Sequence, residues 1–336
     1  MGESRLASLD LLSGCTHEEI VDLRRRLEQR SLGAGEVLMS QGEPGGFFAL
    51  LVDGEVTVER ESANGVERLA TAGPGSIVGE LALLLHRERT ATVRASRPTT
   101  VAVGDADDLD HLVGLTEVHE RMESLATRRL AESVRPTPIR LRDGSEIVLR
   151  PLVPADRAAY ASAIGALSAD SLRRRFLAGG RPSSRMIDYL VDIDYVDHFA
   201  WVVQDPARLD EVLGTARFVR LNQDHDHAEV AFEVADDHQG RGIATQLLGA
   251  IGVAAAAAGI EVLEATVLLD NSPMRAVFDK IGATASFGDP GEIHLEMAPV
   301  AAAGLLEPDR RHAMDRAVRD IVTAAGLALT RPPPPA

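Results

Sequence analysis

The clearest alternation of apolar and polar positions lies in residues 229–234. Val230 and Phe232 would occupy one face of a strand and Glu229 and Glu233 the other, because successive side chains point to opposite faces. Two glycines follow within residues 239–244, and an apolar stretch at helical spacing begins at about Thr245. The pattern predicts a strand, a glycine-containing turn and a helix.

Residues 16–104 change from a helical pattern to a series of short strands. Thr16 and Glu19 fit a capping box at a helix start, in which a hydroxyl and a carboxylate bind the first backbone N–H groups. From residue 31, short apolar runs are separated by turn signals, of which Asp53-Gly54 and Asn64-Gly65 are typical of hairpins. Short strands at nearly even spacing predict a small antiparallel β-barrel or jelly roll with flanking helices.

The rest of the pattern divides the chain into two domains and a tail. Residues 107–134 predict one or two helices, and Pro136 and Pro138 predict a stiff linker after them. A strand and a proline-led helix start at residues 147–157 open the second domain. A last helix is expected at residues 309–329, before a disordered proline-rich tail at 332–335. The expected domains are residues 1–134 and 147–300, with a linker at 135–146 and a C-terminal segment at 301–336.

Length and charge narrow the class of protein. A chain of 336 residues is too long for one ordinary core. Its 51 acidic and 35 basic residues give a net charge of −16, which disfavours nucleic acid and anionic membranes and suits a cationic partner. Cys15 is the single cysteine, which excludes an internal disulfide and a thiolate metal cluster. With no signal peptide and no apolar run long enough to span a bilayer, we expect a soluble cytoplasmic protein without a bound metal.

The loop at residues 239–244 has the backbone chemistry of an anion site. Gly240 and Gly242 let the main chain approach a ligand closely, because they carry no Cβ. The first N–H groups of the following helix have no partner inside it and point to the same place. The pattern predicts a cradle for a phosphate or diphosphate, against the alternative of an ordinary strand-to-helix turn.

The order Gln-x-x-Gly-x-Ala at residues 239–244 resembles the acetyl-CoA loop of the GNAT N-acyltransferase superfamily. The resemblance implies an α+β GNAT fold for the second domain and acetyl-CoA as its co-substrate. Asn271 matches the family asparagine that contacts the CoA arm, and a helix N-cap is its alternative role. Residues 168–176 look like a segment of bacterial GNAT domains that acetylate proteins such as acyl-CoA synthetases, with a solvated helix face as the alternative for Arg173–Arg175. The residues implied in acetyl-CoA binding are Phe232, Val234, Gln239, Gly240, Arg241, Gly242, Ile243, Ala244, Thr245 and Asn271.

Residues 77–93 contain the groups needed to hold a cyclic nucleotide. The phosphate of such a ligand needs a guanidinium and helix-start N–H groups, and its ribose 2′-hydroxyl needs a carboxylate acceptor. Glu80 and Arg89, nine residues apart, supply the two charged groups. The alternative is a surface ion pair between them.

The order Gly-Glu-x-Ala-x6-Arg-Thr-Ala-Thr-Val at residues 79–93 resembles the phosphate-binding cassette of cyclic-nucleotide-binding domains. The resemblance implies cAMP or cGMP as ligand of the first domain. Thr90 is found in binders of both nucleotides, and cAMP is preferred. The residues implied in binding are Gly79, Glu80, Leu81, Ala82, Arg89, Thr90 and Ala91.

Two carboxylates on the predicted strand are candidates for a catalytic base. A lysine amine, with a pKa of about 10.4, must lose a proton to attack a thioester. At about 3.3 Å per residue, Glu229 lies about 16 Å upstream of Val234, so it suits the far end of the pantetheine arm and Glu233 is the second candidate. A strand N–H near Phe232–Val234 would polarise the thioester carbonyl. Phe278 stands where many GNATs have a tyrosine, so the acid for the leaving thiolate stays unassigned.

Together the two motifs resemble the actinobacterial cyclic-nucleotide-regulated protein lysine acetyltransferases. The resemblance implies transfer of acetyl from acetyl-CoA to a lysine ε-amino group of a target protein, such as an acyl-CoA synthetase, under the control of cAMP. Two alternatives remain, an N-acetyltransferase for a small amine and a non-enzymatic cAMP sensor. A cAMP-dependent transcription factor is disfavoured, because no basic helix-turn-helix follows the sensor.

Overall fold

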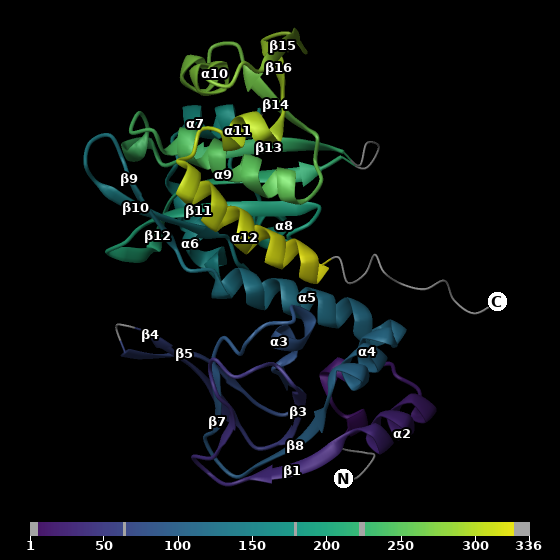
Figure 1. Ribbon diagram of the computed structural model, residues 1–336. Helices are drawn as coiled ribbons and strands as arrows, with labels where there is room; N and C mark the ends of the chain where they lie inside the picture. Colours follow the sequence, from purple (N-terminus) through teal and green to yellow (C-terminus); the bar gives the residue numbers. More distant parts are fainter. Residues whose placement is uncertain (1–5, 63–64, 178–179, 222–225, 326–336) are drawn as a thin grey trace, which may run out of the picture. The chain divides into compact units, whose positions relative to one another are not determined.

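The computed structural model describes residues 6–62, 65–177, 180–221 and 226–325 (Figure 1). The chain forms two compact units, which meet in the sequence between Ala126 and Thr127. The division falls inside helix α5 (Thr116–Ser133), shortly before the domain end expected at residue 134.

The first unit is a sandwich of two four-stranded antiparallel sheets, in the orders β1-β8-β3-β6 and β2-β7-β4-β5. Buried apolar residues of both sheets, among them Met39, Leu51, Val56 and Val101, share one core. This arrangement confirms the predicted jelly roll, and the two sheets do not close into a barrel. The strands are Glu28–Leu32 (β1), Val37–Met39 (β2), Phe48–Asp53 (β3), Val56–Ser62 (β4), Gly65–Ala72 (β5), Ile77–Val78 (β6), Thr92–Ala95 (β7) and Thr99–Gly104 (β8).

The turn at Asp53-Gly54 joins the two sheets, so the hairpin predicted there is wrong. β3 pairs with β6 and β8, whereas β4 pairs with β5 and β7. Gly54 has a φ of 96°, and a Cβ there would lie 2.4 Å from Thr99, so glycine is needed where the chain changes sheets. β4 and β5 do pair antiparallel on either side of the second predicted turn, although Asn64 lies outside the described residues.

Helices pack against the first unit's strand β3. Helix α2 (His17–Arg26) begins with the predicted capping box, in which Glu19 N donates to Thr16 Oγ1 at 3.3 Å and Thr16 N donates to Glu19 Oε2 at 2.7 Å. Apolar side chains of α2, α4 (Ala106–Gly114) and the first half of α5 form a second core with Phe48 and Leu50. The helices expected in residues 107–134 are therefore α4 and α5.

The second unit is built on one eight-stranded sheet in the order β15-β16-β14-β13-β12-β11-β10-β9. β13 and β14 run parallel, and every other neighbouring pair is antiparallel. Val230 and Phe232 on β13 are buried and Glu229 is exposed, as their alternation predicts. The strands are Thr137–Arg140 (β9), Glu146–Pro151 (β10), His198–Asp205 (β11), Arg208–Arg220 (β12), His227–Val234 (β13), Val262–Leu268 (β14), Thr284–Phe287 (β15) and Glu292–Met297 (β16).

Strand β9 lies within the segment expected to be a linker. Ile139 is opposite Ile147 of β10, and both side chains are buried. Pro138 fits because β9 is an edge strand, where a missing backbone N–H leaves no neighbouring strand unpaired. The segment 137–140 is therefore part of the second unit's sheet.

Helices cover both faces of this sheet. Helix α9 (Ile243–Ala257) packs on one face against β11, β12 and β13, where the buried Trp201 Nε1 donates to Ala250 O at 2.9 Å. Helices α11 (Pro299–Ala303) and α12 (Pro308–Ala325) pack on α9. On the other face, α6 (Arg157–Ala166) packs on β12 and α7 (Ala169–Phe176) on β13, with α8 (Ser184–Val191) beside α6. This confirms the predicted α+β domain.

The C-terminal helix begins where the sequence predicts it. α12 starts at Pro308, one residue before the expected start at Asp309. Its expected end at residue 329 and the proline-rich tail at 332–335 lie outside the described residues. The remaining helix of the second unit, α10 (Ser272–Asp279), follows β14.

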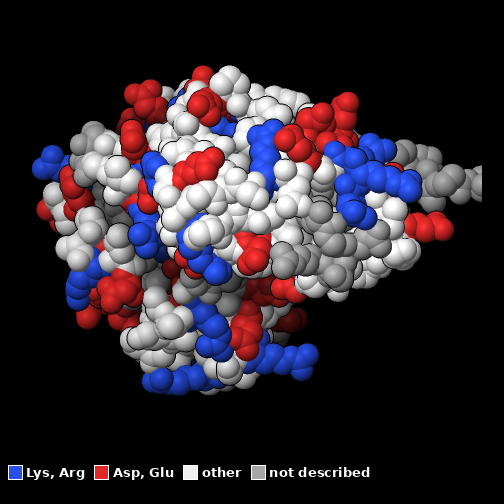
Figure 2. All heavy atoms as spheres, turned by 90° about the horizontal axis from the view of Figure 1, so that it is seen from below, with Lys and Arg blue, Asp and Glu red and all other residues white. Residues whose placement is uncertain are grey.

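Charged side chains of both signs are interspersed over the face shown in Figure 2. The acidic excess of the sequence is thus spread over this face beside many basic groups. Of the helices that the structure describes, none combines the length and the apolar character needed to cross a membrane.

Candidate functional site

The main pocket of the second unit opens where two parallel strands separate. β13 and β14 pair only from His227 to Glu229, opposite residues 262–264. Beyond that point both strands continue without pairing to each other, and the pocket is lined by residues 229–234 on one side and 265–267 on the other. Glu229 therefore lies at the apex of a fork in the sheet.

The glycine-containing loop closes the other end of this pocket. Gly240 and Gly242 have φ values of 75° and 93°, a region that residues with a Cβ rarely adopt. Gly242 is the N-cap of α9, which begins at Ile243, two residues before the expected start. A left-handed glycine fixes that start, so the N–H groups of the first turn border the pocket.

Most residues implied in acetyl-CoA binding line this one pocket. Arg241 is the exception, because its guanidinium is directed to the β9–β10 turn. Its Nε lies 2.7 Å from Asp143 Oδ2 and its Nη2 donates to Ser145 Oγ at 2.6 Å. The predicted residues that line the pocket are Glu229, Phe232, Glu233, Val234, Gln239, Gly240, Gly242, Ile243, Ala244, Thr245 and Asn271.

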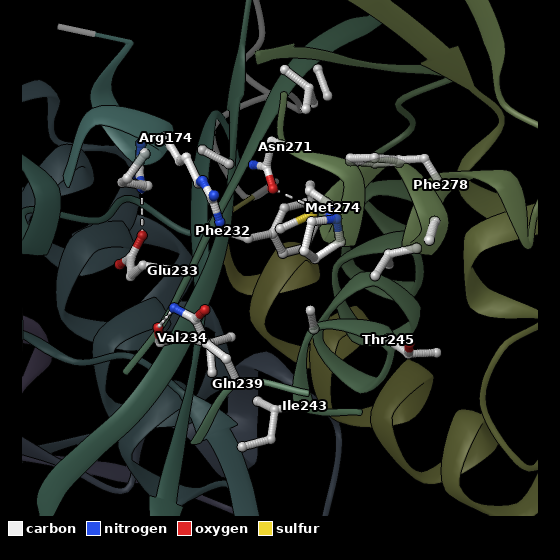
Figure 3. A pocket seen from close by; sticks show the side chains of 18 of the residues that line it. Arg174, Phe232, Glu233, Val234, Gln239, Ile243, Thr245, Asn271, Met274 and Phe278 are labelled. Carbon is white, nitrogen blue, oxygen red and sulfur yellow. Dashed lines mark hydrogen bonds and ion pairs between the residues drawn. The ribbon is translucent and has the colours of Figure 1, made fainter. Parts of the chain in front are cut away.

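Gln239, the first residue of the loop motif, holds the loop in place. Its Nε2 donates to Val234 O and to Ser171 Oγ, both at 3.1 Å (Figure 3). Asp236, just before it, accepts hydrogen bonds from Ser168 N at 2.8 Å and from Ser171 Oγ at 2.5 Å. These bonds tie α7 to the loop, so α7 forms a fixed wall of the pocket.

The two candidate bases have different surroundings. Glu229 is exposed at the apex of the fork, where an incoming amine has access. Glu233 is 8% exposed, and both of its carboxylate oxygens accept hydrogen bonds. Oε1 accepts from Tyr160 OH at 2.8 Å and from Thr215 Oγ1, and Oε2 accepts from Arg175 Nε at 2.5 Å. This saturation makes Glu233 a poor proton acceptor.

Charge keeps Glu233 ionised. Burial alone would raise its pKa, but the cations Arg175 and Arg217 and the hydrogen bond from Thr215 outweigh burial and hold the pKa below its usual value. Burial and the Glu233 charge raise the pKa of the neighbouring Tyr160. Glu233 is therefore a structural anion at the centre of a buried network.

Sequence reasoning missed most of this network. Arg175 belongs to the arginine run for which a solvated helix face was the alternative, yet its side chain is only 9% exposed. Arg217 is buried on β12 and donates to Tyr160 OH at 2.9 Å and to Leu190 O at 2.5 Å. The only available signal for Arg217 was an arginine inside an otherwise apolar strand. Three further cations that line the pocket, and were not predicted, are Arg142, Arg174 and Lys280.

Asn271 has the N-cap role that the sequence offered as its alternative, and it also lines the pocket. Its Oδ1 accepts from Met274 N at 3.3 Å at the start of α10. Phe278, further along α10, is buried and packs edge-on against Phe232, with ring centroids 6.0 Å apart. Phe278 thus forms part of an apolar wall and offers no hydroxyl.

In the first unit, the predicted charged pair is buried. Glu80 is 2% exposed and Arg89 is 5% exposed, so the alternative of a surface ion pair is wrong. Arg89 donates to Gly79 O at 2.6 Å and to Phe47 O, and its guanidinium lies 5.1 Å from the centroid of the Phe47 ring. Burial lowers the pKa of Arg89, and the carboxylates of Glu80 and Glu43 act against this.

The backbone around this pair is shaped by Gly79. Its φ is 84°, and a Cβ there would lie 2.7 Å from Arg89 Nη1 and 2.6 Å from Met39. Leu81 and Ala82 follow in the short helix α3 (Glu80–Leu84), and Thr90 and Ala91 lie in the bend before β7. The sequence therefore brings the carboxylate and the guanidinium together through one glycine.

Within the described residues, no group of three or more potential metal ligands gathers.

Known proteins match both units. Residues 29–114 match the family model of the cyclic nucleotide-binding domain, and residues 146–284 match that of the acetyltransferase (GNAT) domain. Over 97 residues, 29% of this chain and 18% of that protein, the chain is 34% identical to a cAMP-dependent protein kinase regulatory subunit of Mycosarcoma maydis. A solved cAMP-binding acyltransferase from Mycobacterium smegmatis matches with a TM-score of 0.47 and 33% identity, covering 96% of this chain and 97% of that chain.

A sequence match also spans nearly the whole chain. Over 320 residues, the chain is 36% identical to Acetyltransferase Pat of Mycolicibacterium smegmatis, which covers 95% of this chain and 96% of Pat. The residues matched by both domain models fall within this one alignment with Pat. The chain therefore belongs to the family of Acetyltransferase Pat, as a GNAT acetyltransferase that carries a cyclic nucleotide-binding domain.

Proposed function

We propose that this protein transfers acetyl from acetyl-CoA to a lysine ε-amino group of a target protein, such as an acyl-CoA synthetase, and that cAMP controls the reaction. The observation that carries the proposal is the forked sheet, with an exposed glutamate at its apex and a glycine loop at its open end. The membership of the Pat family supports the acetyl donor, and the proposal adds the acceptor, the base and the ligand of the sensor.

The fork supplies the binding chemistry for the donor. On the side of β13 that faces β14, the backbone groups of residues 230–234 have no strand partner. Apart from Val234 O, which accepts from Gln239 Nε2, they are available to the amides of a pantetheine arm. The loop N–H groups at residues 240–244 suit the diphosphate. Glu229 lies about 16 Å from Val234 along an extended strand, at about 3.3 Å per residue, which suits the reach of the arm.

Glu229 is the base in this mechanism. It takes a proton from the lysine ammonium, directly or through water, and the free amine attacks the thioester carbonyl. A C–N bond forms, the C–S bond breaks and CoA leaves as a thiolate, while the nitrogen loses its second proton to solvent and becomes the amide N–H. A β13 N–H near Phe232 polarises the carbonyl as negative charge develops on its oxygen. Because Phe278 offers no proton, the thiolate is protonated from solvent.

The test is an acetylation assay with radiolabelled acetyl-CoA on lysine-bearing proteins and on small amines. Glu229→Gln is expected to lower kcat/KM by about 10²- to 10⁴-fold, the usual contribution of a general base. The matched control is Glu296→Gln. Glu296 is an exposed glutamate on β16 and does not line the pocket. Full activity in Glu229→Gln would reject this base, and activity on small amines alone would reject a protein acceptor.

The sensor is proposed to bind cAMP through Arg89 and Glu80. In the structure Arg89 is already held at Gly79 by carbonyl acceptors, and a cyclic phosphate would replace neutral oxygens by charged ones, which form stronger hydrogen bonds. Arg89→Lys keeps the charge but loses the planar fork. We expect it to need a higher cAMP concentration for the same change in acetylation rate. Equal rates of the wild type with and without cAMP would reject the regulatory part.

The proposed setting is the cytoplasm. The donor, the nucleotide and an acyl-CoA synthetase would all be met there. A nucleic-acid partner has no support in the fold, because the unit after the sensor is an acetyltransferase.

A further inference from the structure

Helix α7 holds Arg174 at the donor pocket in a fixed position. Its N-terminal turn is held by Asp236, and its C-terminal turn is held by the ion pair of Arg175 with Glu233. Arg173, which does not line the pocket, pairs with Asp270 at 2.7 Å. Arg174 lies between these anchored neighbours, so its backbone position is determined by contacts on both sides.

The Arg174 side chain extends into the pocket. In Figure 3 it points toward Asn271 and Phe232, which lie on opposite sides of the fork. Its Nη2 pairs with Asp170 Oδ2 at 2.8 Å, one helical turn back. This pair holds the guanidinium against the pocket wall.

One donor of this guanidinium lacks an acceptor. Arg174 Nε is buried, and no described residue accepts a hydrogen bond from it. Leaving a buried polar group without a partner is unfavourable, so each such group in a native structure needs an explanation. Since Arg174 is the pocket-lining residue among the described ones with such a donor, a small shift of its side chain lets a ligand in the pocket supply the acceptor.

The position of Arg174 along the pocket indicates which part of the acyl donor it would contact. Glu229 marks the thioester end, and the loop at residues 240–244 marks the diphosphate end. Phe232 lies between them on β13, level with the arm that joins thioester and diphosphate. Near the loop a different cation is available, because Lys280 Nζ donates to Thr245 Oγ1 at 2.7 Å at the start of α9. The diphosphate therefore has its own basic neighbour.

We propose that Arg174 is a positioning residue for the acyl donor. The Nε–H of Arg174 donates to an amide carbonyl of the pantetheine arm. The inference rests on the proposed function, because it requires acyl-CoA in the fork. The contact fixes the arm midway between its two ends, so that the thioester lies beside Glu229. Asp170 sets the orientation of the guanidinium for this contact.

The test measures binding of whole CoA and of 3′-phospho-ADP, its nucleotide part without the arm, by calorimetry. The variants are Arg174→Gln and Arg174→Lys, with Arg185→Gln as control for the loss of an exposed arginine on α8. We expect Arg174→Gln to weaken CoA binding about 10-fold, the usual effect of one lost hydrogen bond from a charged group, and to leave 3′-phospho-ADP binding unchanged. Its KM for acetyl-CoA should rise by a similar factor while kcat changes less than about 2-fold.

Arg174→Lys separates the hydrogen bond from the charge. A lysine keeps the charge but has no planar Nε–H, so its CoA affinity should resemble that of Arg174→Gln. Full affinity in Arg174→Lys, or equal weakening of CoA and 3′-phospho-ADP in Arg174→Gln, would overturn the inference. Unchanged CoA binding in Arg174→Gln would also overturn it. If the wild type bound no CoA at all, the proposed function would fail before the role of Arg174 came into question.

Discussion

At the scale of single residues, the second unit depends on a buried cluster of charges beneath its pocket. Glu233, Arg175 and Arg217 lie within one hydrogen-bonded network that also includes Tyr160 and Thr215. Removing one partner from a buried pair leaves the other charge without compensation, which costs more than the pair itself contributes.

Glu233→Gln is therefore expected to lower the free energy of unfolding by about 3 kcal/mol, because Arg175 and Arg217 stay buried without their anion. Urea unfolding of the full chain measures the change, with the exposed Glu296→Gln as control. Since the folded pKa of Glu233 is below its unfolded value, its contribution is present above the unfolded pKa and is lost as pH falls through the folded one. A variant as stable as the wild type, but inactive, would make Glu233 a candidate catalytic base again.

His198 predicts a second pH dependence, at higher pH. Burial, reinforced by the charge of Arg217, lowers its pKa from 6.5 to about 4. The folded state thus holds His198 neutral, and its contribution to stability is present above pH 6.5 and is lost as pH falls toward 4, at up to about 1.4 kcal/mol per pH unit.

Urea unfolding between pH 7 and 5 checks this prediction. His198→Gln should show a shallower loss of stability over that range than the wild type, whereas the exposed His312→Gln should follow the wild type. Equal pH profiles for all three proteins would show that His198 is not the responsible group.

At the scale of elements, the loop before α9 is the part that sequence predicts best and whose geometry is easiest to test. Gly242→Ala places a Cβ where φ is 93° but where no atom lies within 4 Å, so the cost is backbone strain of about 1–2 kcal/mol and no collision. Because the strain would shift the start of α9, CoA binding should weaken as well.

Gly259→Ala is the matched control for this prediction. Gly259 has a φ of 74°, equally open surroundings and a place after the C-terminal end of α9. It should lose similar stability in thermal unfolding and keep the CoA affinity of the wild type. Equal CoA affinity of the two variants would show that the loop geometry at Gly242 is not needed to bind the diphosphate.

Local patterns predicted the elements, whereas contacts between distant segments decided the rest. The alternation at 229–234, the capping box at Thr16 and the glycines at 240 and 242 depend on neighbours in sequence, and the structure has the expected strand, helix and turn there. By contrast, Arg175 bonds to Glu233 and Arg241 to Asp143. These partners are 58 and 98 residues away in the sequence, so no local pattern specifies them. The turn at Asp53-Gly54 was mispredicted for the same reason, because sheet membership is set by tertiary pairing.

At the scale of the whole molecule, the chain carries two ligand sites in two units. A ligand that binds only the folded protein raises its stability by about 2.7 kcal/mol at 100 times Kd. We therefore expect cAMP and CoA each to raise the thermal midpoint of the unit that binds it. Arg89→Lys should reduce the cAMP shift and leave the CoA shift unchanged, as seen by calorimetry of the full chain. Loss of both shifts in Arg89→Lys would point to general damage to the fold.

The separation of β13 from β14 has a consequence for the enzyme before its donor binds. Strands β14, β16 and β15 are joined to the remainder of the sheet through only three residue pairs, at His227, Ala228 and Glu229. An acyl donor lying in the gap acts as a missing rung between the two halves, so loading should stiffen the outer three strands as well as deliver the reagent. We therefore expect the three outer strands to become more rigid each time an acyl donor binds and to regain their motion when CoA leaves.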